Sequence, residues 1–536
     1  MIRGRVEHNL VFIESFEEKE LGVLRKALKF YEKKFYSSPG ESDYTVISIY
    51  DEFKNAFPTG YLNKVKNKLE EKNINFKFTD NRRYKKNTYK IKQVTDFENP
   101  PREWQKKAIE ESKDHHVGFI SAPTASGKSR VINELILHHQ VKTLVIVPSQ
   151  NIQTQVANKL RKLIGSSNVS EKIPKQTNEE FLEEQKRVSE SKANLMKEFL
   201  EGKRSDGFHH EVDKSSLLEY LGVEETPEEK YLKEKGHFDK TQKQPKKIKK
   251  KVKKVREINH AVTVCCYQSL QDYSIKFMDG IEMVIIDEAH HSSSVTIRKA
   301  LNDMPNAAFR FGFSATPWRD KKVDMELLES ALGNVTIFEY DPEKALEDEV
   351  IAAPELRVIH PAAPEIYLAK LKNWRAILEQ GIIGNKVRND LIVYEASEAF
   401  YQGKNVLICV DEISHAEILE EKFKEIELDS ILIHGRKNRK LNESNIKKIG
   451  ENSEEGMISI GTMSVGEGTD MPYIDVVVLA SGGKSSIRFL QKIGRALRRP
   501  EGKEKALIID FQDWFNPILL KHSLARQKIF QEYFRI

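Results

Sequence analysis

Residues 121–130 of this 536-residue chain read SAPTASGKSR, and this stretch decides the fold. The general phosphate-loop pattern is G-x-x-x-x-G-K-[ST]. Gly127, Lys128 and Ser129 match it, while Ala122 replaces its first glycine. The apolar run HVGFI precedes the loop and the helical pattern RVINELILHH follows it. Helix N-terminal amides point at a bound anion, so this order predicts a nucleotide-binding loop in which Lys128 reaches the β- and γ-phosphates and Ser129 holds Mg²⁺.

Two series of short apolar runs follow one another along the chain, each alternating with helical stretches. Such alternation predicts parallel strands joined by crossover helices. We therefore expect two similar α/β domains in tandem, residues 96–345 and 355–536, behind a small α/β module at residues 1–95. The first series comprises HVGFISA, TLVIVP, AVTVCCY, MVIID and FRFGFSA, and the second NVLICV, SILIHG, MISIGT, DVVVLAS and ALIIDF.

The N-terminal module mixes helical and strand periodicity. Apolar residues recur at helical spacing from Leu21 to Phe35 and again from Leu62 to Leu69. The run VISIY at 46–50 and the apolar alternation at 74–78 predict strands. The module is therefore expected to be α/β.

A basic segment closes this module. In DNRRYKKNTYK, residues 80–90, two tyrosines alternate with basic residues. Such a mixture suits a nucleic-acid backbone, with rings available for stacking. A solvated edge strand explains the same composition equally well. The candidate backbone contacts are Arg82, Arg83, Lys85 and Lys86.

A charged insertion interrupts the first series at residues 165–258. It is dense in Glu and Lys, and it ends in the run QPKKIKKKVKKVR at 244–256. Such a run predicts a flexible solvated segment, with a nucleic-acid contact as the sharper alternative and a nuclear-import signal as a third.

Composition excludes several classes of protein. The chain carries 87 basic and 81 acidic residues, a net charge of +6, so any nucleic-acid surface must be a local patch. No apolar run approaches the roughly 20 residues that span a bilayer, and MIRGRVEHNL lacks a signal-peptide core, which predicts a cytoplasmic location. Three cysteines cannot form a four-cysteine zinc site or an iron–sulfur cluster, so no structural metal cluster is expected.

Two carboxylates follow a buried strand in MVIIDEAHH, residues 283–291. Downstream of a phosphate loop, such a pair can divide two tasks: one carboxylate holds Mg²⁺ and the other orients and deprotonates the attacking water. Asp287 and Glu288 are therefore candidate catalytic residues.

A pair of arginines lies in QKIGRALRR, residues 491–499, within the second series. Arg495 and Arg498 are three residues apart and share one face of a helix. Guanidinium groups from a neighbouring domain can neutralise charge on the γ-phosphate, contributing on the order of 10³–10⁵ in rate. A basic surface helix is the alternative explanation of the pair considered alone.

These three pieces in this order resemble the superfamily 2 helicases and translocases, whose paired RecA-like domains bind ATP between them. The resemblance covers roughly residues 100–500. It includes PREWQ (101–105, the Q motif), PTASGKS (123–129), PSQNIQTQ (148–155), YQSL (267–270), DEAH (287–290), SAT (314–316), LICVDEISHAEIL (407–419), GTMSVGEGTDMP (461–472) and the segment 491–498.

The resemblance implies a role for each matching residue, with ATP and Mg²⁺ as cofactors. Adenine and phosphate contacts fall on Arg102, Gln105, Thr124, Ala125, Ser126, Gly127, Lys128, Ser129, Gly468 and Asp470. Ser129 and Asp287 would bind Mg²⁺. The residues implied to act in hydrolysis are Lys128, Asp287, Glu288, Gln491, Arg495 and Arg498. His290, Ser314 and Thr316 would couple hydrolysis to domain motion. Gln155, Gln268, Ser269 and Thr462 would contact nucleic acid.

Within the superfamily, DEAH and QKIGR point away from the DEAD-box RNA helicases and towards the UvsW-type DNA helicases of large bacteriophages, relatives of the XPB-like and RecG-like motors. The segments 57–82 and 510–534 resemble the flanking parts of those phage proteins. The resemblance implies a monomeric motor that unwinds or remodels branched DNA in the 3′ to 5′ direction in the host cytoplasm.

An RNA helicase is the alternative within enzymes, and a nucleic-acid-binding scaffold with a vestigial motor is the alternative outside them. Intact Lys128, Glu288, Gln491, Arg495 and Arg498 argue against the scaffold. Between Pro472 and Ser485 only YI and SGGK lie outside the strand run, too little for a strand-separating hairpin. This favours remodelling of forks and junctions.

Overall fold

The structure is a computed structural model of the chain. It describes residues 1–33, 44–51, 55–84, 88–97, 99–177, 260–271, 273–315, 322–364, 368–434, 455–462, 471 and 473–535, with isolated positions at 180, 183, 186, 442, 444, 445, 448 and 449. The chain divides into two compact units. One comprises Met1–Asn81 with Lys175–His260, and the other comprises Arg82–Pro174 with Ala261–Ile536.

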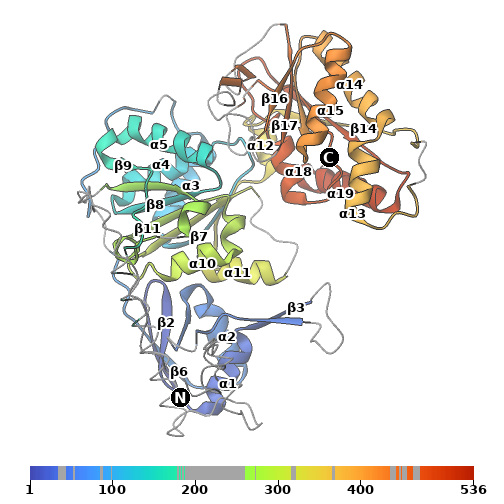
Figure 1. Cartoon of the computed structure of the whole chain (residues 1–536). Helices are drawn as coiled ribbons and strands as arrows, with labels where there is room; N and C mark the ends of the chain where they lie inside the picture. Colours follow the sequence, from blue (N-terminus) through green and yellow to red (C-terminus); the bar gives the residue numbers. More distant parts are fainter. Residues whose placement is uncertain are drawn as a thin grey trace, which may run out of the picture. The chain divides into compact units, whose positions relative to one another are not determined.

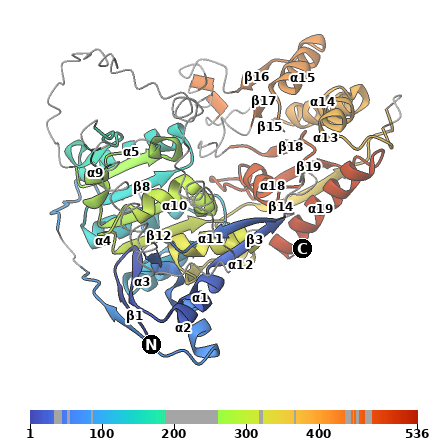
Figure 2. The same cartoon turned by 60° about the horizontal axis from the view of Figure 1, so that its bottom comes forward.

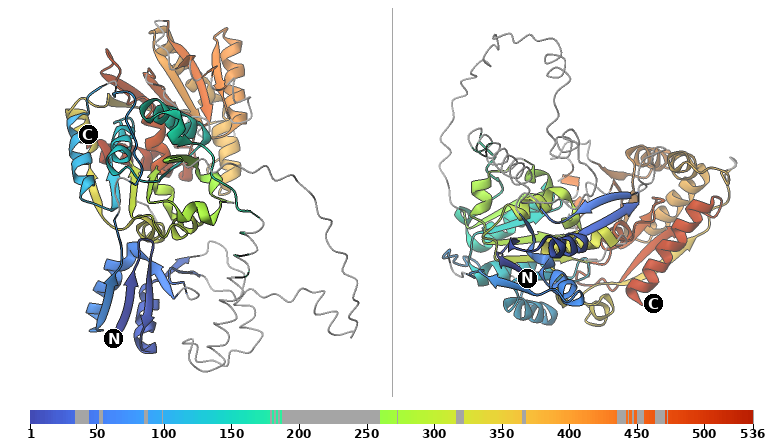
Figure 3. Two further views of the ribbon diagram at one scale, coloured as in Figure 1. Left: turned by 90° about the vertical axis from the view of Figure 1, so that its left-hand side faces the viewer. Right: turned by 90° about the horizontal axis from the view of Figure 1, so that it is seen from below.

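The N-terminal unit is built on a four-stranded sheet of order β5-β2-β1-β6, and Figure 3 shows its strands side by side. Both helices are amphipathic: α1 buries Leu21 and Leu24, and α2 buries Val65 and Leu69. Its elements are β1 (Ile2–Val6), β2 (Leu10–Ser15), α1 (Glu18–Ala27), β3 (Lys29–Lys33), β4 (Tyr44–Ser48), β5 (Ala56–Pro58), a 3-10 turn (Thr59–Tyr61), α2 (Leu62–Glu71) and β6 (Phe76–Asp80).

The helix predicted from Leu21 to Phe35 is wrong in its second half. α1 ends at Ala27, and Lys29–Lys33 form β3, which pairs with β4 in an antiparallel ribbon. The sequence KFYEK combines aromatic residues with alternation, and strand pairing therefore outweighed the continuing helical spacing. β1 and β2 were not predicted at all.

The first of two parallel sheets has the order β13-β7-β12-β11-β8-β10-β9. α3, α4 and α5 cover one face, and α10 and α11 cover the other (Figure 1), on which α9 also packs. Its elements are α3 (Glu103–Lys113), β7 (Val117–Ser121), α4 (Lys128–His139), β8 (Thr143–Val147), α5 (Gln150–Ile164), β9 (Val169–Ser170), β10 (Val262–Cys266), a 3-10 turn (Tyr267–Leu270), α9 (Ile275–Asp279), β11 (Met283–Asp287), a 3-10 turn (Ala289–Ser293), α10 (Val295–Asn302), β12 (Phe309–Ser314), α11 (Lys322–Leu332), β13 (Thr336–Glu339) and α12 (Pro342–Glu347).

The second parallel sheet has the order β14-β19-β18-β15-β17-β16. α14 and α15 pack on one face and α18 and α19 on the other, as Figure 2 shows. Its elements are β14 (Ala353–Ile359), α13 (Trp374–Ile377) with a π-helical turn (Leu378–Ile383), α14 (Lys386–Tyr401), β15 (Asn405–Val410), α15 (Ile413–Glu425), β16 (Ser430–Ile433), β17 (Met457–Thr462), β18 (Val476–Leu479), α18 (Ser486–Ile493), β19 (Lys505–Phe511) and α19 (Pro517–Phe534).

The predicted fold class is therefore confirmed: two tandem RecA-like parallel-sheet domains and a small α/β region before them. Every apolar run predicted as a strand in the two series contains a strand, while the edge strands β9, β13 and β14 were missed. The charged insertion lies almost entirely outside the described residues, as does its lysine run.

Candidate functional site

The phosphate loop leaves the first sheet at the end of β7 and leads directly into α4. Ala125 and Gly127 both have positive φ, +69° and +99°, which turns the loop so that α4 begins at Lys128. A Cβ on Gly127 would lie 2.8 Å from Nε2 of Gln105. Glycine is needed here for both reasons, since other residues adopt this conformation at a cost.

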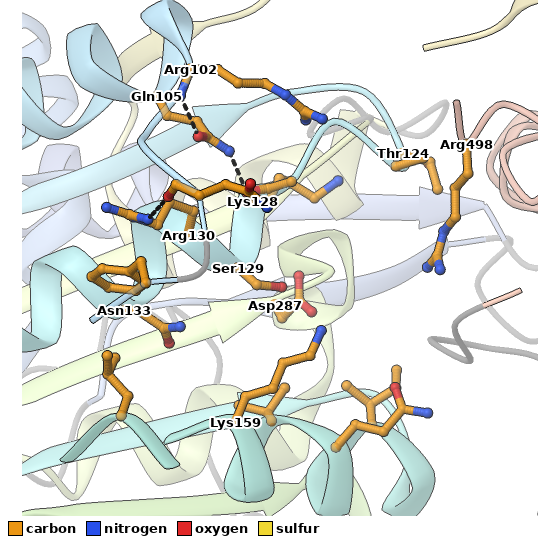
Figure 4. Close-up of a pocket in the computed structure, with 18 of the residues that line it drawn as sticks. Arg102, Gln105, Thr124, Lys128, Ser129, Arg130, Asn133, Lys159, Asp287 and Arg498 are labelled. Atoms are coloured by element: carbon orange, nitrogen blue, oxygen red, sulfur yellow. Dashed lines mark hydrogen bonds between the residues drawn. The ribbon is translucent and has the colours of Figure 1, made fainter. Parts of the chain in front are cut away.

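Two residues of the Q motif hold the backbone of this loop through hydrogen bonds. Gln105 Nε2 donates to the Gly127 carbonyl at 3.1 Å, and Arg102 Nη1 donates to the Ser126 carbonyl at 2.8 Å. The Gln105 side-chain oxygen in turn accepts from the Arg102 amide, which caps α3. The start of α3 therefore fixes the loop's backbone (Figure 4).

Lys128 and Ser129 stand at the first turn of α4. The Lys128 ammonium donates to the carbonyls of Ala122 and Pro123 at 3.1 and 3.3 Å. Ser129 and Asp287 lie side by side in Figure 4. Burial and the neighbouring Glu288 carboxylate raise the pKa of Asp287 to about 6, although the charge of Lys128 opposes the shift. A hydroxyl beside a buried carboxylate is the hard oxygen set that suits Mg²⁺.

Glu288 has a left-handed backbone, φ +51°, which turns it away from the strand direction of β11. His290 lies 3.2 Å from its carboxylate and 3.3 Å from the Ser314 hydroxyl, so these three side chains form a short polar chain. Burial disfavours the charge of Glu288, but His290 and Lys128 outweigh it and lower its pKa to about 2. Glu288 is therefore ionised at neutral pH.

Tyr267 was missed by the sequence reasoning as a member of this site. Its hydroxyl donates to the carbonyl of Asp287 at 2.5 Å and lies 3.1 Å from that of Glu288. It thereby ties the turn after β10 to the strained backbone after β11. Its neighbours Gln268 and Ser269 had already been singled out, so the same motif could have identified it.

One cavity of about 1350 Å³ gathers most of the predicted nucleotide residues. Ser126 is fully buried behind its wall. Arg498 keeps its charge at neutral pH, because burial lowers its pKa only to about 10. The predicted residues on the wall are Arg102, Gln105, Thr124, Ala125, Gly127, Lys128, Ser129, Gln155, Asp287, Glu288, Gln491, Arg495 and Arg498.

The predicted nucleic-acid residues are not brought together. Gln155 lines the nucleotide cavity, and Gln268 and Ser269 are exposed at the carboxyl end of β10. Thr462 is buried at the end of β17, beside Arg495. Three further predicted residues, Thr316, Gly468 and Asp470, lie outside the described residues.

The basic segment after the N-terminal unit lies at the amino ends of the first sheet's strands, the edge opposite the phosphate loop. Tyr84 packs on His116, just before β7, with ring centroids 3.6 Å apart. Tyr89 is partly buried and packs against the hydrophobic core. Arg82 lies over the Tyr84 ring at 5.9 Å. Arg83 is described and exposed, whereas Lys85 and Lys86 fall outside the described residues.

Together, the phosphate loop, the two carboxylates and the arginines form a candidate nucleotide site in a class of protein with two RecA-like domains. Two family models match the sequence in agreement with this. The family described as "Type III restriction enzyme, res subunit" matches residues 98–218 and 223–319, and "Helicase conserved C-terminal domain" matches residues 390–500. The chain belongs to the superfamily 2 helicases, as predicted.

Individual relatives are about a quarter identical to this chain over the aligned residues. The phage T4 protein "ATP-dependent DNA helicase uvsW" is 26% identical over 257 residues, 47% of this chain and 50% of that protein. An Acanthamoeba polyphaga mimivirus protein, L396, whose name places it among ATP-dependent RNA helicases, is 24% identical over 291 residues, 52% and 53% of the two chains. The chain thus spans about half the length of the curated relatives it matches.

Among solved structures, the DNA-bound Type ISP restriction-modification enzyme LlaBIII matches 88% of this chain and 32% of its own, with a TM-score of 0.50 and 14% identity. This similarity concerns the fold alone. Among the described residues, no helix is both long and apolar enough to cross a membrane.

Proposed function

We propose that the chain couples ATP hydrolysis to movement along DNA and that it remodels branched DNA. One observation carries the proposal: residues of the phosphate loop, the DEAH carboxylates and the arginines after α18 line a single cavity. In a scaffold that no longer hydrolyses ATP, these residues would not need to remain grouped around one cavity.

The residues divide the chemistry between them. The Lys128 ammonium can exchange its loop carbonyls for the β- and γ-phosphate oxygens of ATP. The Glu288 carboxylate accepts a proton from the attacking water, and His290 orients that carboxylate. Arg495 and Arg498 neutralise charge that develops on the γ-phosphate, and Gln491 lies beside them.

Ser129 and Asp287 would hold Mg²⁺. When bound, this ion would supply positive charge that offsets the negative charge of the triphosphate. A cation beside Asp287 would also offset the burial that raises the pKa of this carboxyl group. The residue set therefore fits the cofactor.

DNA is the proposed substrate and RNA is the alternative. The DEAH and QKIGR motifs and the similarity to a protein named as a DNA helicase favour DNA. Because the chain is also similar to L396, RNA is included among the substrates to be tested. The proposed direction is 3′ to 5′, by a monomer in the cytoplasm of a bacterial host.

Remodelling is favoured over unwinding of long duplexes. From Tyr473 to Ser485 the chain forms β18, an inner strand paired with β15 and β19, and then six residues lead from β18 to α18. Two hairpin strands of about 3–10 residues each do not fit there. Strand separation by a hairpin at this position therefore has no structural support.

The test measures ATPase stimulation by single strands, duplexes, forks, four-way junctions and RNA, together with fork reversal and unwinding of a long tailed duplex. Forks and junctions should stimulate most and be rearranged while the tailed duplex stays paired. Lys128→Ala should lose hydrolysis while DNA binding persists. Efficient unwinding of tailed duplexes with intact junctions would reject remodelling, and stimulation by RNA alone would reject DNA.

The basic segment is proposed as a DNA contact at the far edge of the first sheet. Each phosphate contact contributes roughly 0.7–0.9 to the slope of log affinity against log salt. Replacing Arg82, Arg83, Lys85 and Lys86 with alanine should therefore reduce this slope by up to about 3.6. An unchanged slope would assign the segment to a solvated surface instead.

A further inference from the structure

A second cavity, of about 430 Å³, lies wholly within the second RecA-like domain and has no part in the ATP site. Its volume falls in the range of small-molecule sites, roughly 300–1,000 Å³. The residues that matter for its chemistry are Trp374, Asp411, Glu412, Lys484, Arg488 and His522.

The topology of the sheet places this cavity where α/β proteins bind ligands. β15 and β18 are neighbouring parallel strands. Leu407 and Val477 face α18 and α19, whereas Val406 and Val476 face α14 and α15. The helices that follow these two strands therefore leave to opposite faces of the sheet. Ligands of open α/β sheets bind in the crevice at the carboxyl ends of strands at such a switch point.

The charges on the cavity wall leave one net positive charge. Lys492 is buried and paired with Asp411 at 2.7 Å, and it also contacts Ser481. Arg526 is committed to Asp510, which lies behind the wall, at 2.9 Å. Lys484 and Arg488 remain as exposed cations at the mouth, against the single exposed carboxylate of Glu412. One net charge matches one phosphodiester rather than a triphosphate.

The wall of the same cavity also carries an exposed aromatic side chain. Trp374 is 40% exposed, and its ring centroid lies 5.0 Å from that of His522. His522 Nδ1 lies 3.1 Å from the Gly482 carbonyl, which fixes the ring. Burial lowers the pKa of His522 and so favours the neutral ring. A base can stack on an exposed indole whatever its sequence.

We propose that this second-domain cavity binds one unpaired nucleotide of the DNA strand, with its base on Trp374 and its phosphate between Lys484 and Arg488. The inference adds a strand contact to the proposed function and rests on it for the identity of the strand. α18 forms a wall of both cavities: Arg488 and Lys492 line this one, and Gln491 lines the ATP cavity. A nucleotide bound here would therefore contact α18, the helix that leads into the arginines of the ATP cavity.

The test uses the full chain without ATP and measures fluorescence anisotropy of a labelled 20-nucleotide oligodeoxythymidine. Base stacking contributes about 1–3 kcal/mol, so Trp374→Ala should weaken binding by about tenfold. It should not change binding of an abasic oligonucleotide of equal length. Lys484→Ala/Arg488→Ala should weaken both oligonucleotides.

Matched controls separate these effects from general damage. Trp514→Ala removes another exposed tryptophan of the same domain that lies outside the cavity, and Lys521→Ala/Lys528→Ala removes two exposed lysines of α19. Both should bind like the parent chain. Equal binding by Trp374→Ala and Trp514→Ala would overturn the proposal. Competition by free dTMP as effective as competition by the oligonucleotide would also overturn it and indicate a site for small nucleotides.

This experiment is independent of the ATPase measurements. Absence of hydrolysis would reject the proposed motor function while the binding comparison still decides the cavity. Loss of the Trp374 effect with normal ATPase would reject the cavity alone.

Discussion

The two parallel sheets share a strand order over six positions and differ in what their strands lead into. β7, β11 and β8 of the first sheet occupy the places of β14, β18 and β15 in the second. In the first, β7 leads into the phosphate loop and β11 into Asp287 and Glu288. In the second, β14 leads into HPAAP (360–364) and β18 into Ala480 and Ser481. A phosphate loop and a pair of carboxylates therefore follow strands of the first sheet only.

The buried charged side chains around the second sheet form ion pairs within the domain. Arg388 is fully buried and pairs with Asp513 at 2.9 Å, and Arg526 pairs with Asp510 in the core. The second domain contributes Arg495 and Arg498 to the wall of the large cavity, but α18 ends at Ile493, so the prediction that both arginines lie on a helix is wrong. The two sheets therefore share one topology and differ in the side chains at their strand ends.

The largest expected effect tests the contribution of the second domain to hydrolysis. Arg498→Ala should slow ATP turnover by about 10³–10⁵, with little change in ATP affinity, because a finger acts in the transition state. Single-turnover hydrolysis and equilibrium ATP binding measure both quantities. The adjacent Arg499 pairs with Glu349 and does not line the cavity, so Arg499→Ala is the matched control. A fall in ATP affinity at unchanged turnover would make Arg498 a ground-state ligand.

A somewhat smaller effect tests the first sheet. Glu288→Gln should slow hydrolysis by about 10²–10⁴ and still bind ATP, since an amide cannot accept the water's proton. Glu282 precedes the opposite end of β11 and accepts from the Thr88 hydroxyl at 2.6 Å. Glu282→Gln should therefore turn over ATP normally. Comparable losses in both variants would mean that the carboxyl edge of this sheet has no special role.

The architectural role of the second domain's charges can be tested by unfolding. Arg388→Met should destabilise the protein by about 3–5 kcal/mol, because it leaves Asp513 buried without its partner. Arg357→Met removes an exposed arginine paired with Glu395 and should cost about 0–1 kcal/mol. Urea unfolding followed by tryptophan fluorescence compares them. Arg388→Met/Asp513→Leu should recover most of the loss, and equal effects of the two single variants would contradict the role.

The smallest expected effect concerns the shape of the phosphate loop. Gly127→Ala adds a left-handed penalty of about 1–2 kcal/mol and a Cβ that would lie 2.8 Å from Gln105 Nε2. ATP affinity, measured by calorimetry, should fall by about tenfold. Gly502 has a similar φ, +84°, and open space around its Cβ position. Gly502→Ala should leave ATP affinity unchanged, and equal loss in both variants would refute the loop argument.

The sequence by itself determined the tandem α/β class, the inner strands and the identity of the loop, the carboxylates and the arginines. These features are local: apolar runs report buried parallel strands, and strand–loop–helix order reports an anion site. It could not find β3, whose residues continue a helical spacing, because pairing with β4 is a contact between separate segments.

Only the tertiary structure decided which distant residues meet. Tyr267 contacts the backbone of Asp287 and Glu288 because β10 and β11 both flank β8, and no spacing in the sequence encodes that neighbourhood. The position of residues 82–84 at the amino edge of the first sheet is likewise set by a contact between separate parts of the chain. Side chains that look equivalent along the chain, such as Arg498 and Arg499, differ in what they face. That difference is set by packing, since neighbours along a chain can point into a cavity or away from it.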